Sequence, residues 1–452
     1  MFKRLAVLCT RFSLKNSVRL SSVSTLGQCR YSLKELRVIR HRTSLAWLLI
    51  CPVGCWRGPA SPKSASGESR SPDISATGTP SKNNQSRAGS SLAPGPSDGG
   101  TGSRGEQSTG GGSRASDYDL ENPRIVRVLA IDGGGIRGVI PARIIWEIER
   151  RTQRHATELF DCITGTSTGG IIALGLALPG PDGKPRYWAN ELAEFYSRDG
   201  SRIFYRSYLY AIESADGLRR PKYPADSIES WLREKFQEAQ LKDALCDVLI
   251  TSYDIERRRV HLFNSWDARA RPDCNFNMRD VARATSAAPT FFPPALIESL
   301  ADPPKFALID GGVAANDPAM CGLVDARRRH RAAKIIVVSV GTGDSESPIP
   351  YEKAVNWGAA EWALNILDVV WDGSTEAAEE QLRELLPDDR DGPHYFRLQP
   401  ALGQSSSKMD DASPEHIEAL DRLTDDFIAQ NDSAIQKICD RLVQYASGGN
   451  KP

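Results

Sequence analysis

Ser167 is the residue that the sequence places best for nucleophilic chemistry. It stands between Gly165 and Gly169 in a Gly-x-Ser-x-Gly pattern, after the segment Leu159–Thr164 and before the apolar segment Ile171–Leu178. Between a strand and a helix, this pattern forms a tight elbow that exposes the serine hydroxyl. Because the second segment is apolar on all sides, we expect a buried helix whose N-terminus stabilises negative charge beside the serine.

A glycine-rich loop precedes this serine. Residues 132–138 read Asp-Gly-Gly-Gly-Ile-Arg-Gly and follow the segment Ile125–Ala130. Backbone N–H groups at such a helix start bind anions, and a serine nucleophile beside them indicates hydrolysis of acyl esters. A dinucleotide site would need an acidic residue at the end of the next strand, where this chain has Ile163-Thr164-Gly165. A nucleotide P-loop is excluded, because no Gly-Lys-Ser/Thr follows the glycines.

Asp310 is the leading candidate for the base that takes the serine proton. It ends the apolar segment Phe306–Ile309 and is followed by Gly311 and Gly312. A carboxylate at a strand end can reach the end of a neighbouring strand, where ligands bind in open parallel sheets. The Asp-Gly pair is equally typical of a plain Asx turn, so the local sequence leaves both interpretations open.

The composition divides the chain into three parts. Residues 1–58 are basic, and their start, rich in Arg, Lys and Ser, is typical of an organellar transit peptide or of an unstructured basic arm. Residues 59–120 are dominated by Ser, Gly and Pro and are expected to form a disordered linker. Residues 121–452 are expected to fold as one large α/β domain with a C-terminal helical region.

The totals exclude several classes of protein. The 452 residues carry a formal net charge of zero and no basic stripe dominates the folded part, so we expect no nucleic-acid partner. No apolar stretch reaches the ~20 residues that span a bilayer. The scattered cysteines favour reduced thiols in an intracellular compartment, cytoplasmic or organellar. No His, Asp and Glu cluster has zinc-like spacing, and we expect neither a metal nor another cofactor.

Strand and helix patterns alternate through the folded part, which favours a layered, largely parallel sheet. Helices are expected to open at Val139, at a capping box on Asp226 and at Ser413. The aromatic segments Phe204–Tyr210 and Trp357–Trp371 are expected mainly in the core, with the walls of a cleft as the alternative. The expected strands are Arg124–Ile131, Phe160–Thr164, Val248–Asp254, Val260–Phe263, Phe306–Ile309, Lys334–Val340 and Tyr395–Leu398.

The motifs, in this order, resemble those of the patatin-like phospholipases. Residues 132–138 look like the oxyanion loop of that family, residues 165–170 like its nucleophile elbow, and Asp310-Gly311-Gly312 like its aspartate motif. Residues 283–289, 339–343 and 394–398 are similar too, so the likeness spans the folded part from about Arg124 to the C-terminal helices.

This resemblance implies a three-layer α/β/α sandwich with a mostly parallel central sheet. It implies a Ser-Asp dyad without histidine, with Ser167 as nucleophile and Asp310 as proton acceptor, acting on fatty acyl esters of phospholipids or related lipids. Peripheral contact with membranes is a further expectation. The chain departs from the family at Asp317, where members often have a second Asn, which adds a charge near the periphery of the site. The implied oxyanion positions are Gly133, Gly134 and Gly135, and the motif-flanking positions are Arg137, Gly138, Gly165, Gly169, Gly311 and Gly312.

Three other interpretations stay open. Chain order allows a Ser-Asp-His triad of the α/β-hydrolase type, with His330, His394 or His416 as its third member. A non-catalytic lipid-binding domain would keep the fold, although the complete serine, aspartate and glycine-loop positions disfavour it. An acyltransferase would use the same acyl-enzyme, and the sequence does not separate it from a hydrolase.

Overall fold

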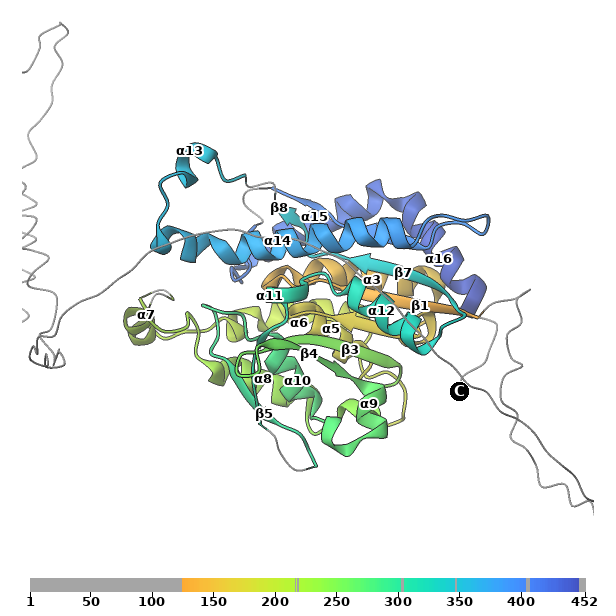
Figure 1. The fold of residues 1–452 in the computed structure, drawn as a ribbon, viewed down its shortest axis with the longest axis horizontal. Helices are drawn as coiled ribbons and strands as arrows, with labels where there is room; N and C mark the ends of the chain where they lie inside the picture. The colour runs from red at the N-terminus through yellow and green to blue at the C-terminus, as the bar shows by residue number, and fades with distance from the viewer. Residues whose placement is uncertain are drawn as a thin grey trace, which may run out of the picture. The chain divides into compact units, whose positions relative to one another are not determined.

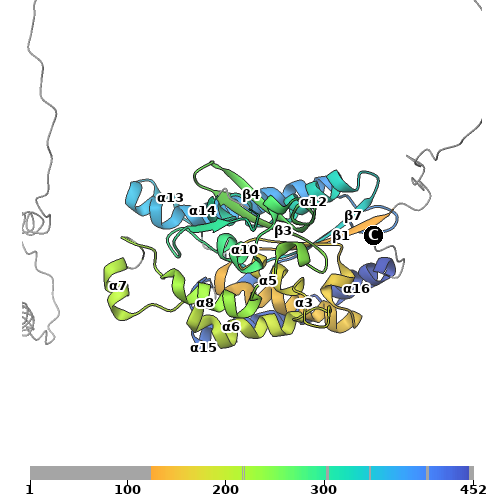
Figure 2. The same cartoon turned by 90° about the horizontal axis from the view of Figure 1, so that it is seen from below.

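The computed structural model describes residues 124–215, 217, 219–301, 305–345, 348–403 and 407–446. The basic arm 1–58 and the linker 59–120 expected from the composition lie outside these residues. The described residues form a domain in which helices cover both faces of a central sheet (Figures 1 and 2). This arrangement confirms the α/β/α sandwich expected from the sequence.

The central sheet has eight strands in the order β5-β6-β3-β2-β1-β7-β9, with β4 paired to β3 beside this path. The pairs among β3, β2, β1, β7 and β9 are parallel, whereas β4, β5 and β6 pair antiparallel. The strands are β1 (Ile125–Ile131), β2 (Cys162–Gly165), β3 (Asp247–Asp254), β4 (Arg259–Asn264), β5 (Ala295–Glu298), β6 (Lys305–Asp310), β7 (Lys334–Val340) and β9 (Tyr395–Leu398).

The seven strands expected from the sequence are all present, but three others were not expected. β5 is a short edge strand, and β8 (Asp344–Ser345) and β10 (Ala401–Leu402) form a separate parallel pair. Segments of two to four residues are too short to show the alternation by which a strand is recognised.

Helices α12 and α14 lie on one side of the sheet, and α3, α5, α6 and α8 lie on the other (Figure 2). No helix within the described residues has the length and apolar content needed to cross a bilayer. The helices are α3 (Val139–Thr152), α4 (Ala156–Leu159), α5 (Thr168–Leu176), α6 (Ala189–Ile203), α7 (Tyr208–Ser214), α8 (Ala225–Phe236), α9 (Ser265–Ala270), α10 (Met278–Thr285), α11 (Gly312–Ala315), α12 (Ala319–Arg329), α13 (Tyr351–Ala354), α14 (Ala359–Leu385), α15 (Pro414–Gln430) and α16 (Asp432–Ala446), with 3-10 turns at Gly135–Gly138, Leu241–Asp243 and Pro272–Cys274.

The core is divided by the sheet, as the alternation of side chains along β1 shows. Leu129 and Ile131 pack into the larger cluster with α3 and α5. Val128 and Ala130 point to the other face and join a smaller cluster that includes Leu323 of α12. Because both faces are covered, the central strands are apolar almost throughout, as expected for parallel strands between two helical layers.

Two of the three expected helix starts are confirmed. α3 begins at Val139, and Ser413 caps α15 by accepting a hydrogen bond from the His416 N–H at 3.4 Å. The capping box expected on Asp226 is wrong, because α8 begins at Ala225 and has no side-chain cap. Asp226 lies inside the first turn, where its charge still favours the helix N-terminus.

Candidate active site

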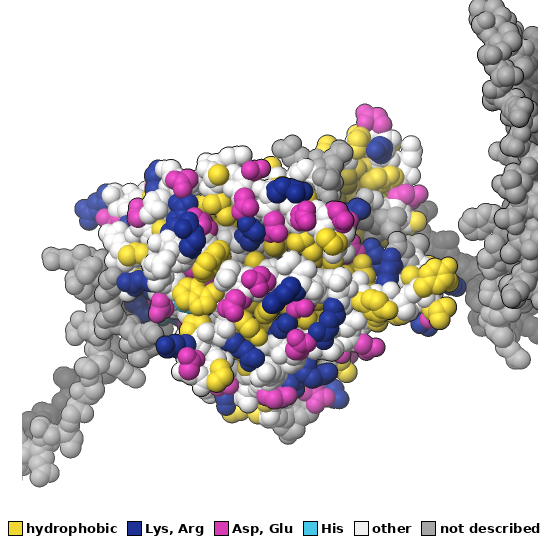
Figure 3. All heavy atoms as spheres, turned by 180° about the vertical axis from the view of Figure 1, so that it is seen from behind, with side chains coloured by type: hydrophobic (Ala, Val, Ile, Leu, Met, Phe, Trp, Pro, Cys, Tyr) yellow, Lys and Arg dark blue, Asp and Glu magenta, His cyan; other side chains and the backbone are white. Residues whose placement is uncertain are grey.

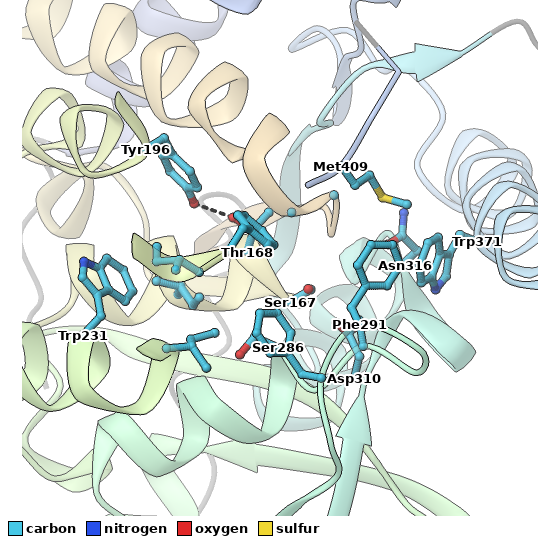
Figure 4. Close-up of a pocket in the computed structure, with 18 residues that line it drawn as sticks. Ser167, Thr168, Tyr196, Trp231, Ser286, Phe291, Asp310, Asn316, Trp371 and Met409 are labelled. Atoms are coloured by element: carbon cyan, nitrogen blue, oxygen red, sulfur yellow. Dashed lines mark hydrogen bonds between the residues drawn. The ribbon is translucent and has the colours of Figure 1, made fainter. Parts of the chain in front are cut away.

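Ser167 lies at the turn between β2 and α5, where the sequence predicts the nucleophile elbow (Figure 4). Its backbone has φ 54° and ψ −123°, a conformation that residues other than glycine rarely adopt. The Ser167 N–H donates to Thr285 Oγ1 at 2.8 Å, and the Thr166 hydroxyl donates to Ala315 O at 2.7 Å. Neighbouring elements therefore hold the strained turn in place.

The two glycines of the elbow are required by close backbone packing. A Cβ atom at Gly165 would overlap the backbone of Gly169, and a Cβ atom at Gly169 would overlap the carbonyl group of Ile131 at the end of β1. A side chain at either position would push β2, α5 and β1 apart. The spacing of the motif thus reflects the meeting of two strand ends and one helix start.

Asp310 reaches Ser167 because β2 and β6 share one edge of β3. β2 pairs with the first half of β3 and β6 with the second half, while β4 pairs with residues of both halves. β2 and β6 must therefore follow each other along the edge opposite β4. Asp310 pairs with Ser252, two residues beyond Ile250, which is the partner of Gly165. Since β6 runs antiparallel to β3, the carboxylate meets the elbow end-on, not from a neighbouring parallel strand.

The carboxyl group of Asp310 is buried and lines the same pocket as the Ser167 side chain. It accepts a hydrogen bond from the Gly312 N–H at 2.8 Å. Burial raises the pKa of Asp310 to about 7, and the Ser167 side chain and the Gly312 N–H oppose the rise. Asp310 makes no ion pair with any described residue, so no cation lowers its basicity.

The glycine loop brings backbone donors to the same place. Gly134 and Gly135 line the pocket that holds Ser167, and their N–H groups donate to no other described residue. The Gly133 N–H instead donates to Asn316 O at 3.1 Å, and its carbonyl accepts from Thr342 Oγ1 at 2.7 Å. Gly133 therefore anchors the loop, and of the three loop glycines Gly134 and Gly135 keep N–H groups without an acceptor among the described residues.

Arg137 supports the loop from outside the pocket. It does not line the pocket, and its Nη1 donates to Ser407 O at 3.5 Å. Burial lowers the pKa of Arg137, while Asp368 and Asp372 oppose this effect. The remaining flanking glycines pack closely against neighbouring side chains; they are Gly138, Gly311 and Gly312.

The pocket around Ser167 has two unlike walls, with Trp231 and Trp371 on opposite sides of the serine (Figure 4). The Trp231 wall is formed by α6 and α8 and is largely apolar. The Trp371 wall also contains the amide of Asn316. Most of the lining is apolar, which suits an alkyl chain next to the serine. The other lining residues are Gly134, Gly135, Thr168, Ile171, Tyr196, Ile203, Phe204, Ile228, Ser286, Ala288, Phe291, Phe292, Asp310 and Met409.

The two aromatic segments expected in the core are largely outside it. Phe204 and Trp371 line the pocket, as the alternative interpretation had it. Tyr208 is 80% exposed and Trp362 is 38% exposed. A short aromatic run has no periodicity that separates a core segment from a surface segment, so the sequence could not decide this.

The three candidate histidines of a triad lie away from the pocket. His394 Nδ1 lies 3.1 Å from Ile335 O, and its Nε2 lies 3.1 Å from an Asp389 carboxylate oxygen. His416 Nε2 lies 3.2 Å from Lys408 O. His330 directly follows α12, and none of the three lines the pocket. Their distance from the pocket disfavours the Ser-Asp-His interpretation.

A buried ion pair behind the glycine loop was not predicted from the sequence. Arg397 of β9 donates from Nη1 and Nη2 to the two carboxylate oxygens of Asp132, at 3.0 and 2.7 Å. Its Nη1 also lies 3.6 Å from Asp317, whose carboxylate accepts from Ser339 Oγ at 3.1 Å. The expected extra charge of Asp317 is therefore neutralised inside the protein and does not face the pocket. Burial opposes it, but Asp132 and Asp317 raise the pKa of Arg397, which stays charged.

Comparison with known proteins agrees with this architecture. Residues 129–321 match the patatin-like phospholipase family. Patatin-like protein 1 of Oryza sativa subsp. indica is 30% identical over 357 residues, which cover 72% of this chain and 86% of that protein. Patatin-1-Kuras 2 of Solanum tuberosum is 31% identical over 331 residues, which cover 67% of this chain and 86% of that protein.

Among solved structures, human GIVD cytosolic phospholipase A2 is 12% identical. The match covers 73% of this chain and 61% of that chain, with a TM-score of 0.37. A TM-score this low carries no argument, so the family assignment rests on the relatives found by sequence, which are matched over most of their length. The chain belongs to the patatin-like phospholipase family.

Proposed function

We propose that this protein is a lipid acyl hydrolase that cleaves fatty acyl esters through Ser167 and Asp310. The observation that carries this proposal is the contact between the strained serine and a buried carboxyl group whose pKa is raised to about 7. A base of this strength holds a useful fraction of carboxylate at neutral pH and still returns the proton readily. The pocket and the two backbone donors stand beside the same serine.

The reaction proceeds in two steps through an acyl-enzyme. Asp310 accepts the Ser167 proton as Oγ attacks the ester carbonyl, and the oxyanion forms against the Gly134 and Gly135 N–H groups. Asp310 then gives the proton to the departing alcohol, which leaves the acyl group on Ser167. Water attacks this ester, passes a proton to Asp310, and the fatty acid departs as Ser167 recovers its proton. The carboxyl group ends each cycle as it began.

The substrate that fits best carries an unbranched apolar acyl chain. Behind Ser167 the pocket wall is formed by Ile203, Ile228 and Trp231, which offer contact to an alkyl chain and few polar partners to anything else. Phospholipids and related acyl lipids supply such chains, and their low solubility makes contact with membranes part of this proposal. No feature of the pocket favours transfer to an alcohol over transfer to water.

The test is the purified full chain on a soluble chromogenic fatty acyl ester. Wild type should release the fatty acid and react with a fluorophosphonate at Ser167, and Ser167→Ala should do neither while its circular dichroism stays unchanged. A folded wild-type protein with no turnover would favour the lipid-binding alternative. Product that appears only when an acceptor alcohol is added would favour the acyltransferase.

Two further proposals concern the parts outside the described residues. Residues 1–58 act as a targeting arm and residues 59–120 as a linker, on composition alone. A chain that starts near Asn122 should keep its activity on soluble esters. Residues 1–58 fused to a fluorescent protein should direct it to an organelle, and a diffuse cytosolic signal would refute the targeting role.

A further inference from the structure

Two helices expose large apolar side chains at the same end of the domain. Figures 1 and 2 both place α7 and the start of α14 at this end, and hydrophobic side chains also gather at this end when the protein is seen from behind (Figure 3). We name this set the apolar rim. Its members, with their exposed fractions, are Tyr208 (80%), Leu209 (72%) and Ile212 (59%) of α7 and Trp362 (38%), Ile366 (42%) and Val369 (40%) of α14.

The part of the rim on α14 is an ordered helix face, not a scatter of single residues. Trp362, Ile366 and Val369 follow each other at spacings of four and three, so they lie on one side of the helix. Surface helices normally turn such a face toward the core, but here it faces outward. Trp371, two positions after Val369 and therefore on the other side of the helix, is 9% exposed. An exposed apolar stripe on a helix whose other side is buried marks an interaction surface.

Both parts of the rim lead directly into the wall of the pocket. Phe204, which lines the pocket, stands four residues before α7, and Trp371, which lines it from the other side, stands two residues after Val369. The segments that carry the rim therefore continue into both walls of the pocket, with Trp371 on the side of α14 opposite Val369.

We propose that the apolar rim docks the protein on the surface of a lipid aggregate, so that an acyl chain enters the pocket directly from the bilayer. This inference rests on the proposed function. Tyr and Trp beside Leu, Ile and Val are the side chains that enter the boundary between headgroups and acyl chains. The segments that carry both helices also supply Phe204 and Trp371 to the pocket wall, so a lipid aggregate held on the rim would lie beside the pocket that receives the acyl chain.

The charges around the rim indicate that docking depends on apolar insertion. On α7, Glu213 pairs with Arg220 at 3.0 Å, and on the other side α13 carries the exposed Glu352 and Lys353. Both signs are therefore present among the described residues beside the rim, so apolar insertion is expected to contribute most of the binding. Binding to neutral phosphatidylcholine vesicles is expected, with little dependence on salt.

The experiment compares two rim variants with two control variants in the full chain. The rim variants are Tyr208→Gln with Leu209→Gln and Ile212→Gln, and Trp362→Gln with Ile366→Gln and Val369→Gln, since glutamine keeps helix propensity. Leu385→Gln lies at the other end of α14, about 28 Å from Ile366 at 1.5 Å per residue, and Leu385 is 46% exposed. Val324→Gln on α12 replaces a residue that is 57% exposed.

Co-sedimentation with phosphatidylcholine vesicles should fall about tenfold or more in each rim variant and stay at the wild-type level in both controls. Hydrolysis of vesicle phosphatidylcholine should fall in proportion, while turnover of a soluble butyrate ester stays unchanged. Wild-type vesicle binding by the rim variants would overturn the inference. If wild type binds vesicles but hydrolyses neither substrate, the proposed function fails and docking stands. If the rim variants only convert a dimer to a monomer in sedimentation equilibrium, a second copy covers the rim and the inference falls.

Discussion

Two Asp-Gly-Gly stretches stand at strand ends of the same sheet, and the protein uses them differently. Asp132 follows β1 and is bound through both carboxylate oxygens to the Arg397 guanidinium. Asp310 ends β6 and contacts Ser167 with no cation beside it. Both side chains are buried. Burial alone therefore does not distinguish the two carboxylates. In the proposed reaction Asp310, with no cation beside it, moves the proton, whereas Asp132 is held in an ion pair behind the loop.

Burial raises the folded pKa of both aspartates to about 7, and the Arg397 guanidinium only partly offsets this rise at Asp132. The usual pKa of an unfolded aspartate is ~3.9. The favourable contribution of each protonated carboxyl group is therefore fully present below about pH 4 and is lost as the pH rises through about 7. What separates the two carboxylates is the cation beside Asp132, not the pKa.

The largest effect is expected from Asp310→Asn, which keeps the shape of the side chain but removes the proton acceptor. kcat/KM on a soluble ester should fall by ~10²–10⁴-fold, as for other general bases. Because the amide is neutral, the melting temperature at pH 8 should not fall. Near wild-type kcat/KM in a folded Asp310→Asn protein would show that another group takes the proton. His394→Ala and His416→Ala serve as controls and should keep substantial activity.

Arg397→Met, in contrast to Asp310→Asn, is expected to lower the stability of the fold. It leaves Asp132 and Asp317 buried without a cation, so the free energy of unfolding in urea should fall by about 3–5 kcal/mol. Glu379→Gln is the matched control, because Glu379 lies 3.7 Å from Arg397 Nε but is partly exposed; it should cost less than about 1 kcal/mol. Equal stability of the two variants would mean that the buried pair does not support the loop.

The features that could be predicted from the sequence are those that depend on consecutive residues. Seven strands, the buried helix after Ser167 and the apolar neighbourhood of Asp310 all follow from local patterns. The proposed role of Asp310 could not be predicted in this way, because an Asx turn would have the same local sequence. Only the pairing of β2 and β6 along one edge of β3 places Asp310 at the elbow. Arg397 lies 265 residues from Asp132, and nothing in its local sequence indicates that pairing.

The glycine loop shows the same limit at the scale of single atoms. Three consecutive glycines look equivalent in the sequence. In the structure the Gly133 N–H is taken by Asn316 O, while Gly134 and Gly135 line the pocket. Which donors remain for an oxyanion depends on a strand and a helix that arrive from elsewhere in the chain. The apolar rim could not be predicted either, because its side chains are of types that usually lie in the core.

A smaller effect is expected from pH, which tests whether Asp310 is the group that must be ionised. Asp310 must be ionised to accept the Ser167 proton, and its folded pKa is raised to about 7 by burial. kcat/KM on a soluble ester should therefore be constant above about pH 8 and fall about tenfold per unit well below pH 7. A profile that stays flat down to pH 5 would place the proton acceptor in a carboxyl group with an ordinary pKa.

The smallest effect is expected from Trp371→Phe on the wall beside Asp310. The Trp371 Nε1 is buried and has no hydrogen-bond partner among the described residues, yet the indole lines the pocket next to Gly312. A substrate oxygen that accepts from this N–H would gain about 0.5–1.5 kcal/mol, and Phe removes the donor while keeping an aromatic ring. KM for 1-monobutyrin, whose glycerol carries oxygens, should rise about two- to tenfold. KM for propyl butyrate, with the same acyl chain and a leaving group without further oxygens, should not change. Equal effects on both esters would mean that Trp371 acts through packing and that its N–H donates to no substrate oxygen.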